Sequence, residues 1–142
     1  MDQSSHHLQL LEQRISSMQA LGKTLELTQA AVAQRDLSVL EQQTRRQREI
    51  CQSLRANAEN LAGSLKPAAG EEAGSEFASR RRMLREQLAA VENHIRELNR
   101  SYAALLRRAK RTIDIFCRLL ASSEQTYAVP AALKTAGASG RK

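Results

Sequence analysis

Aromatic residues are scarce in this chain: only 3% of its 142 residues are Phe, Trp or Tyr, and Trp is absent. Because aromatic side chains supply much of the buried area of a thick globular core, their scarcity argues against such a core. The chain also has only two prolines and six glycines, so long stretches are free of helix breakers. Leu, Ala, Glu, Gln and Arg dominate instead, and all of them favour helices. The composition therefore predicts long, thin helices.

The sequence also lacks a long hydrophobic run. No stretch of about 18 consecutive apolar residues occurs, so we expect no membrane insertion. The first residues have neither the basic start nor the apolar segment of a secretion signal, and we expect a cytoplasmic protein. The two cysteines, Cys51 and Cys117, are far apart in the sequence, which excludes a CxxC redox motif and predicts two free thiols.

Motifs for catalysis are absent as well. The sequence has no Gly-rich phosphate loop and no nucleophile motif, and a thin bundle rarely offers the concave pocket that a small-molecule substrate needs. The histidines at 6, 7 and 94 are scattered, and the adjacent pair points to different sides of any helix. We therefore expect no enzymatic activity, no catalytic residues, no metal ion and no cofactor.

Apolar residues at steps of three and four predict a first helix over about residues 7–35, weakened at Gly22 and Gln29. A tight break is expected at Asp36, which is a good N-cap, although one continuous helix remains open because no proline or glycine lies there. A second helix should follow over about residues 37–62. The first helix has its apolar series at Leu8, Leu11, Ile15, Met18, Leu25 and Val32, and the second has its seam at Leu37, Leu40, Thr44, Gln47, Cys51, Leu54, Ala58 and Leu61, flanked by Ile50.

Residues 63–75 combine three glycines with a proline and acidic residues, and should form a flexible loop. A third helix is predicted over about residues 76–122, so that the helical domain covers 1–122 and the tail 123–142 is mostly disordered. Its seam alternates steps of four and three without interruption, which is typical of a helix that packs along a partner in a coiled coil. The seam positions are Leu84, Leu88, Val91, Ile95, Leu98, Tyr102, Leu105, Ala109, Thr112, Phe116 and Leu119.

These elements predict an all-α fold, a three-helix antiparallel coiled-coil bundle with a long projecting C-terminal helix. At a rise of about 1.5 Å per residue, the first two helices reach roughly 40 Å each and the third about 70 Å. In sequence-order antiparallel packing, roughly residues 103–121 would extend beyond most internal partners. This stretch carries one broad apolar surface, the apolar face, formed by Leu105, Leu106, Ala109, Ile113, Phe116, Leu119 and Leu120.

An exposed face of this kind favours a partner helix. Full burial of a large aliphatic or aromatic side chain contributes about 1.5–3 kcal/mol, so the face could contribute on the order of 10 kcal/mol before the costs of association. A partner helix laid along the face would remove it from water. Two alternatives stay open: self-association through the same face, including a homodimer, and folding back of the tail around Val129 and Leu133.

Two parts of the sequence resemble FlgN-type flagellar export chaperones. The more specific part is residues 99–113 (NRSYAALLRRAKRTI), followed by residues 125–127 (QTY). The other is the layout of the front half, in which a Leu-rich first helix leads to the break after residues 31–36 and then to a second helix rich in Gln, Arg and Glu. The long glycine-containing loop and the strongly basic third helix depart from the simpler members of that family.

The resemblance implies a three-helix cytoplasmic chaperone that binds the C-terminal helical region of hook-filament junction proteins and delivers them to the flagellar type III export gate. In that family the end of the last helix binds the substrate, and a tyrosine in the C-terminal region can contact the gate. Carried over to this chain, the apolar face would bind the substrate, and Tyr127 would be the candidate contact with an export-gate component.

The net charge of +7 is concentrated in the third helix, since residues 76–121 hold 11 Lys and Arg against 5 Asp and Glu. A basic nucleic-acid-binding protein is therefore one alternative, although no zinc finger, basic zipper or aromatic stacking platform accompanies the charge. A coiled-coil adaptor or self-assembling structural protein is the other. The basic groups are Arg80, Arg81, Arg82 and Arg85, then Arg107, Arg108, Lys110 and Arg111, and ion pairs four residues apart are expected at Glu76/Arg80, Glu92/Arg96 and Asp114/Arg118.

Overall fold

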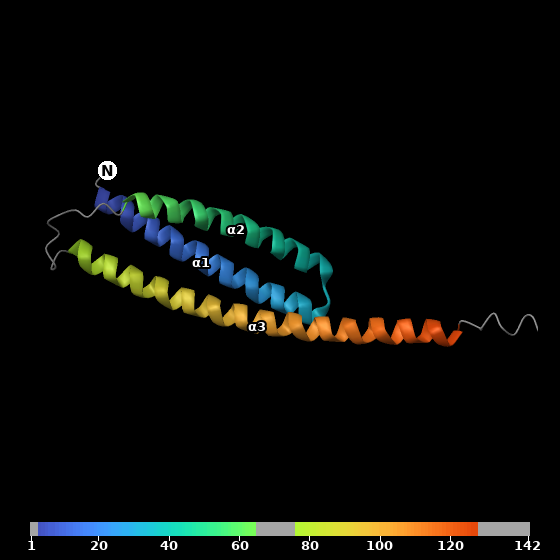
Figure 1. Ribbon diagram of the computed structural model, residues 1–142. Coiled ribbons are helices and arrows are strands. Elements are labelled where there is room, and N and C mark those ends of the chain that lie inside the picture. The colour runs from blue at the N-terminus through green and yellow to red at the C-terminus, as the bar shows by residue number, and fades with distance from the viewer. Residues whose placement is uncertain (1–2, 65–75, 128–142) are drawn as a thin grey trace, which may run out of the picture. The chain divides into compact units, whose positions relative to one another are not determined.

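The computed structural model of the chain describes residues 3–64 and 76–127. These residues form three α-helices, α1 (Gln3–Gln34), α2 (Leu37–Ser64) and α3 (Glu76–Tyr127), so the predicted all-α fold is confirmed (Figure 1). The chain divides into two compact units, Met1–Leu105 and Leu106–Lys142. None of the described helices combines the length and the apolar composition that crossing a membrane requires.

The helix bounds differ from the predicted ones by a few residues. α1 begins at Gln3 rather than near residue 7, and α2 continues to Ser64, two residues into the predicted loop. α3 continues to Tyr127, five residues into the segment predicted as a disordered tail. The rest of the predicted loop and the tail from residue 128 onward lie outside the described residues.

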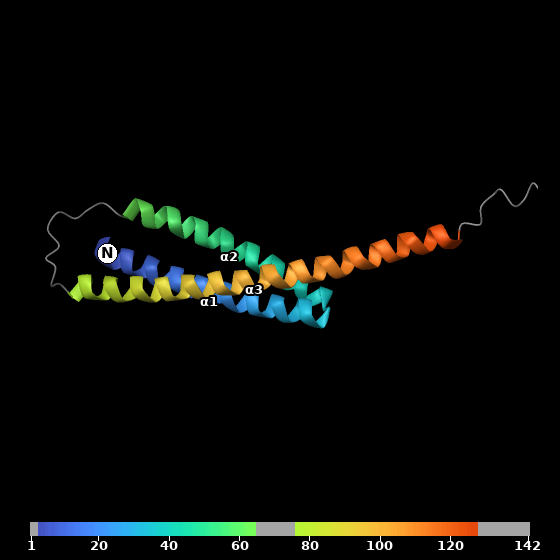
Figure 2. The same cartoon turned by 60° about the horizontal axis from the view of Figure 1, so that its bottom comes forward.

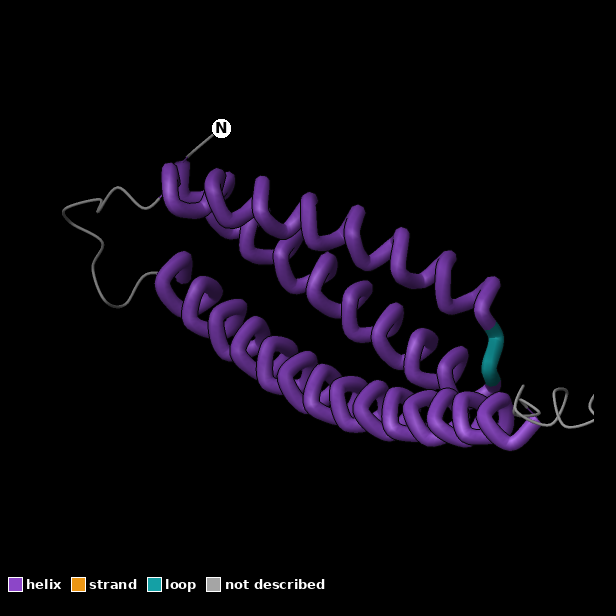
Figure 3. The backbone as a smooth tube through the Cα atoms, turned by 45° about the vertical axis from the view of Figure 1, so that its right-hand side comes forward, coloured by secondary structure: helices purple, strands orange, loops and turns teal. Residues whose placement is uncertain are grey.

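α1 and α2 are separated by a two-residue turn at the place that the sequence predicts (Figure 3). Arg35 has a φ of 58°, and the N–H groups of Arg35 and Asp36 donate to the carbonyls of Val32 and Ala31 over 3.3 and 2.9 Å. This pair of bonds around a left-handed residue is the Schellman arrangement that ends many helices. The Asp36 carboxylate then accepts a hydrogen bond from the Val39 N–H over 3.0 Å and caps α2.

Within the first unit, α2 runs antiparallel to α1 and to the part of α3 that ends at Leu105, as both Figure 1 and Figure 2 show. The contact between α1 and α2 is built largely on side-chain hydrogen bonds. The Gln47 amide donates to the hydroxyl of Thr28 over 2.7 Å, and Thr28 is fully buried. The amide of buried Asn57 donates to the carbonyl of Leu10 over 3.0 Å. Because buried hydrogen bonds are directional, these bonds fix the register of the two helices.

The residues of α1 that meet α2 follow one stripe along the helix. The small side chains of Thr24, Thr28 and Ala31 are buried, and Cα atoms of α1 and α2 come within 8 Å of one another. Small side chains permit such a close approach of two helices. The stripe lies one residue before the predicted apolar series and holds His7, Leu10, Arg14, Leu21, Thr24, Thr28 and Ala31, at helical steps of three, four and seven.

The predicted seam of α2 is wrong at three of its eight positions. Leu37, Cys51 and Ala58 are exposed, whereas Asn57 is buried and Ile50 is half-buried. A buried asparagine or glutamine with a hydrogen-bond partner looks like a surface residue in a sequence, which explains the error. The observed seam is Leu40, Gln43, Gln47, Ile50, Leu54, Asn57, Leu61 and Ser64, and every member is buried or half-buried.

The contact between α1 and α3 is mainly apolar. Leu11 and Ile15 of α1 form a buried cluster with Leu84 of α3. Leu8, Leu61, Leu88 and Val91 pack against this cluster, so α2 contributes to it through one leucine. Burial of such side chains is the main favourable term that holds α3 against α1.

The two positions that weaken the apolar series of α1, Gly22 and Gln29, both lie against α3. A Cβ atom added to Gly22 would lie 3.8 Å from Leu98 Cδ1 and 3.9 Å from Ile95 Cγ1. The Gln29 side-chain amide donates to the Leu98 carbonyl over 2.8 Å. Both residues therefore belong to the contact between α1 and α3 rather than interrupting it.

Replacement of Gly22 by alanine should raise the free energy of unfolding by about 1 kcal/mol. Glycine is about that much less favourable than alanine inside a helix, and the new methyl group would meet its neighbours at ordinary van der Waals distances. Urea unfolding followed by circular dichroism measures the change. Gly63→Ala is the matched control, because a Cβ there meets nothing within 4 Å; an equal gain in both variants would show that packing at Gly22 adds nothing.

Candidate protein-binding surface

The burial of the seam residues of α3 changes along the helix. From Leu84 to Leu105, every predicted seam position is buried or half-buried, with Leu84 and Ile95 the most buried. Ala109 is half-buried, whereas Thr112, Phe116 and Leu119 are exposed. One uninterrupted apolar series in the sequence therefore corresponds to a packed part and an exposed part in the structure.

Helix length accounts for part of this difference. α3 has 52 residues, compared with 32 in α1 and 28 in α2. At about 1.5 Å per residue, these helices measure roughly 78, 48 and 42 Å. Neither shorter helix is long enough to cover α3 from end to end.

Large apolar side chains are exposed in the described part of the second unit. Ile113, Phe116 and Leu120 are 60%, 61% and 65% exposed. Leu106 and Leu119 are exposed as well, while Leu105 and Ala109 are half-buried. With 100° between successive residues, the seven residues of the apolar face fall within an arc of about 140° on one side of the helix. A single helix laid along that side could contact all of them.

Ile115 is an exposed apolar residue that the sequence analysis missed. Its side chain is 59% exposed, similar to that of Phe116 beside it. Its position lies about 40° beyond Leu119, just outside the arc that the seven residues of the face occupy. An edge residue of this kind can contact the side of a bound helix rather than its centre.

Both cysteines of the chain are free thiols and are exposed. Cys117 follows Phe116 directly and lies about 60° from Leu120 around the helix, at the other edge of the apolar face. Cys51 is on α2 in the first unit. The chain therefore has one native thiol beside the candidate surface and one far from it in the sequence.

The first basic group, at residues 80–85, is engaged within the first unit. Arg80 donates to the Glu12 carboxylate of α1 over 2.7 Å, and this hydrogen bond, together with the Glu12 charge, raises the pKa of Arg80. The guanidinium of Arg81 lies 5.7 Å from the centre of the Phe77 ring, within cation–π range. Arg80 therefore has its ion-pair partner on α1.

The second basic group, at residues 107–111, is exposed throughout its charged side chains. Lys110 lies 3.4 Å from the Asp114 carboxylate, so Asp114 pairs with the lysine before it rather than with Arg118 as predicted. Arg96 donates a hydrogen bond to the Asn93 side chain over 2.8 Å, whereas the sequence predicts an ion pair between Arg96 and Glu92.

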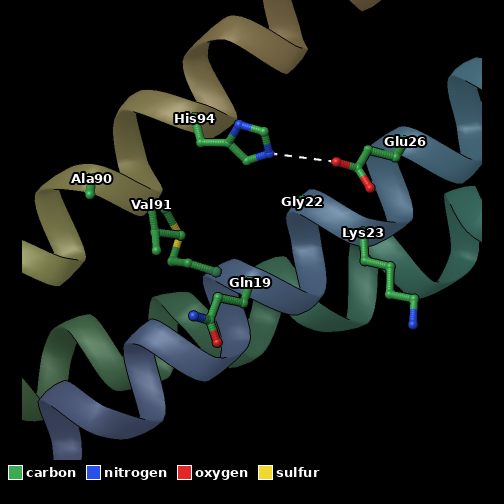
Figure 4. Close-up of a pocket in the computed structure, with 8 residues that line it drawn as sticks. Gln19, Gly22, Lys23, Glu26, Ala90, Val91 and His94 are labelled. Atoms are coloured by element: carbon green, nitrogen blue, oxygen red, sulfur yellow. Dashed lines mark ion pairs between the residues drawn. The ribbon is translucent and has the colours of Figure 1, made fainter.

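An open hollow of about 460 Å³ lies between α1 and α3 inside the first unit (Figure 4). Gly22 and Gln19 line it from α1, and Val91 and His94 line it from α3. His94 Nε2 lies 3.5 Å from the Glu26 carboxylate, and both side chains are more than half exposed. Among the described residues, no group of three or more His, Cys, Asp or Glu side chains lies close enough together to hold a metal ion. The hollow is a shallow groove beside a glycine.

Tyr127 is the last residue of α3 rather than part of a separate tail. It belongs to the second unit, as does most of the apolar face. Tyr102, the tyrosine that the sequence predicts in the seam, is half-buried in the first unit. Val129 and Leu133, the residues of the alternative in which the tail folds back, lie outside the described residues.

Comparison with known proteins gives one match. The family model described as FlgN protein matches residues 1–134 of this chain. The matched range includes all three helices and the whole apolar face. No curated protein and no solved structure matches the chain.

The exposure of the apolar face predicts that it contributes little to the stability of the fold. The double variant Ile113→Ser/Phe116→Ser should change the free energy of unfolding by less than about 0.5 kcal/mol, as is usual for surface substitutions. Leu84→Ser should reduce it by about 3 kcal/mol or more, because a polar group replaces a buried leucine. Thermal and urea unfolding measure both variants; a large loss in the double variant would place the face in a folded core.

Proposed function

We propose, since this chain belongs to the FlgN family of flagellar export chaperones, that it binds hook-filament junction proteins in the cytoplasm before their export. The bound element is the C-terminal helical region of the junction protein, and the binding surface is the apolar face of α3. A subunit held in this way cannot assemble prematurely. The chaperone then delivers it to the flagellar type III export gate.

The exposed apolar face is the observation that supports this proposal most directly. Four of its side chains, those of Ile113, Phe116, Leu119 and Leu120, are 59–65% exposed, and contiguous exposed apolar surface marks interaction sites in many proteins. A helix is a suitable partner because the apolar face is itself a continuous stripe along one side of a helix. Burial of five such side chains contributes on the order of 10 kcal/mol before the costs of association, enough for a specific complex.

The main contacts within the first unit are made by residues outside the apolar face. Its helices are held by the apolar cluster at Leu11 and Leu84 and by the hydrogen bonds of Thr28 and Asn57. None of these residues belongs to the apolar face. A partner can therefore bind the face without any loss of the contacts that stabilise the bundle.

Tyr127 is proposed as a contact with the export gate. It is separated by seven residues from Leu120, the last residue of the apolar face, and both belong to the same helix. Seven residues are two helical turns, or roughly 10 Å along the axis. A gate component could thus approach the end of α3 while a substrate helix occupies the apolar face.

Self-association is the competing role for the same face. A coiled-coil adaptor or a structural protein would bury Ile113 and Phe116 against a second copy rather than against a junction protein. Nucleic-acid binding has less support, because Arg80 of the first basic group is paired with Glu12 and an apolar face gives no contact to phosphates.

The double variant Ile113→Ser/Phe116→Ser should abolish binding of the C-terminal helical region of a hook-filament junction protein from the same organism. The affinity should fall at least about 100-fold, because each truncation removes roughly 1.5–3 kcal/mol of burial. Calorimetric titration of purified components measures this loss. Leu27→Ser is the matched control, since Leu27 is an exposed leucine of α1, and its affinity should stay within twofold of the unaltered chain.

Thiol labelling tests the same contact in the chain as it stands. N-ethylmaleimide should modify Cys117 and Cys51 at similar rates in the free chain, because both are exposed. Addition of the junction-protein segment should slow labelling at Cys117 and leave Cys51 unchanged. If Cys117 is already protected in the free chain at micromolar concentration, and the protection disappears on dilution, the face is covered by a second copy and the proposal is wrong.

Tyr127→Ala should separate binding from delivery. Titration should give an unchanged affinity for the junction-protein segment, because Tyr127 lies beyond the apolar face. Secretion of the junction protein by cells that carry the variant should fall severalfold, as measured by its amount in the culture medium. Tyr102→Phe, which alters the half-buried tyrosine of the first unit, should secrete normally. Unchanged secretion by Tyr127→Ala would remove the gate role from this residue.

A further inference from the structure

The charge around the apolar face is predominantly positive. Residues 106–123 contain five Lys and Arg (Arg107, Arg108, Lys110, Arg111 and Arg118) and a single acidic residue, Asp114. All five basic side chains are exposed. Asp114 is paired with Lys110 at 3.4 Å, so it offsets one of the five. The surroundings of the face therefore carry a strong positive charge.

These charges border the apolar face on both sides. Measured around the helix from Phe116, Arg108 lies at about 80° on the side of Leu119, and Lys110 lies at about 120° on the side of Cys117. Arg111 and Arg118 follow Arg108 farther round, at about 140° and 160°. Arg108 is thus next to the apolar side chains, and the arginines behind it extend the basic border away from the face.

A basic border is unfavourable for a second copy of the same face. Two such helices laid face to face would bring their arginine borders together, and like charges across an interface oppose association. An uncharged partner would bury the apolar side chains but would leave the arginines without counter-charges. A partner with acidic residues beside its apolar stripe would bury the same side chains and pair the arginines.

We propose that the helix that occupies the apolar face carries Asp or Glu residues along the borders of its own apolar stripe, placed to meet Arg108, while Arg111 behind it adds to the positive charge on the same side. This inference rests on the proposed function and names the chemistry of its partner. Apolar burial holds the complex together, while the charged borders select the partner and increase its rate of association. Charges at the border of an interface act mainly on the association rate and on its salt dependence.

The test uses the full chain and the C-terminal helical segment of a hook-filament junction protein, with binding followed by stopped-flow fluorescence. Arg108→Glu/Arg111→Glu should lower the association rate constant at least about tenfold in 50 mM NaCl. In 500 mM NaCl the difference should shrink to about twofold, because salt screens charges that are exposed to solvent. Arg45→Glu/Arg46→Glu makes the same change in charge at two exposed residues of α2 and should differ from the unaltered chain by less than threefold.

Charge reversal on the partner completes the test. A segment whose border Asp and Glu residues are replaced by Lys should bind the unaltered chain slowly and the Arg108→Glu/Arg111→Glu variant rapidly. Such mutual rescue identifies the arginines as the groups that face the acidic residues. The acidic-border proposal is overturned if both chain variants bind at the same rate, or if the altered segment binds the two chains equally well.

The outcomes separate this inference from the proposed function. If Ile113→Ser/Phe116→Ser abolishes binding and charge reversal has no effect, the apolar contact stands and the acidic partner is wrong. If the unaltered chain does not bind the segment at all, both are wrong. Binding of a labelled DNA or RNA oligonucleotide that Arg108→Glu/Arg111→Glu removes, but Ile113→Ser/Phe116→Ser does not, would assign the basic border to nucleic acid and overturn the inference.

Discussion

The fold depends on one property of α1: it contacts two different helices through two stripes that are one residue apart. The stripe that contains Thr28 makes hydrogen bonds to α2, and the stripe that contains Leu11 and Ile15 makes apolar contacts with α3. Hydrogen bonds are directional and set the register of the α1–α2 pair. Apolar burial is nondirectional and contributes most of the favourable free energy in the contact with α3. Hydrogen bonds thus align α1 with α2, and apolar burial holds α1 against α3. α1 is 20 residues shorter than α3.

The sequence was sufficient for elements whose pattern is apolar and uninterrupted. The seam of α3 is correct from Leu84 to Leu105 because leucine, isoleucine and valine have no reason to recur at these steps except burial. The seam of α2 was wrong at three of its eight positions because its true members include Asn57, whose burial depends on a hydrogen bond to Leu10 of another helix. The turn was correctly placed by Asp36, yet a continuous helix stayed open because Arg35 occupies the left-handed position where glycine usually lies. The sequence does not show whether a polar side chain has a hydrogen-bond partner in another helix.

For the candidate surface, the sequence predicted which residues share one side of α3, and the structure adds which of them are exposed. Ile113, Phe116 and Leu120 continue the periodicity of the buried seam, so the apolar pattern alone does not separate the two parts. The lengths of the predicted helices indicated which part is exposed, and the coordinates give the exposure of each side chain. Ile115 was not predicted because it lies outside the arc of the apolar face. The Lys110–Asp114 pair was not predicted because the rule for ion pairs favours an acidic residue four positions before a basic one.

A chaperone with an exposed apolar face must avoid binding to itself. The positive charge of the arginines beside the face opposes such self-association. Five exposed apolar side chains favour association with any apolar surface, including a second copy of the same chain. Because Arg108 is next to the face and Arg111 lies behind it on the same side, two copies that bury the face bring like charges together. The penalty depends on exposed charges, so it is modest, and it acts before contact, when two chains approach one another. A helix with acidic borders meets attraction instead of repulsion at the same distance. The same arginines therefore oppose self-association and favour the partner, and the apolar side chains need only supply the strength of the contact.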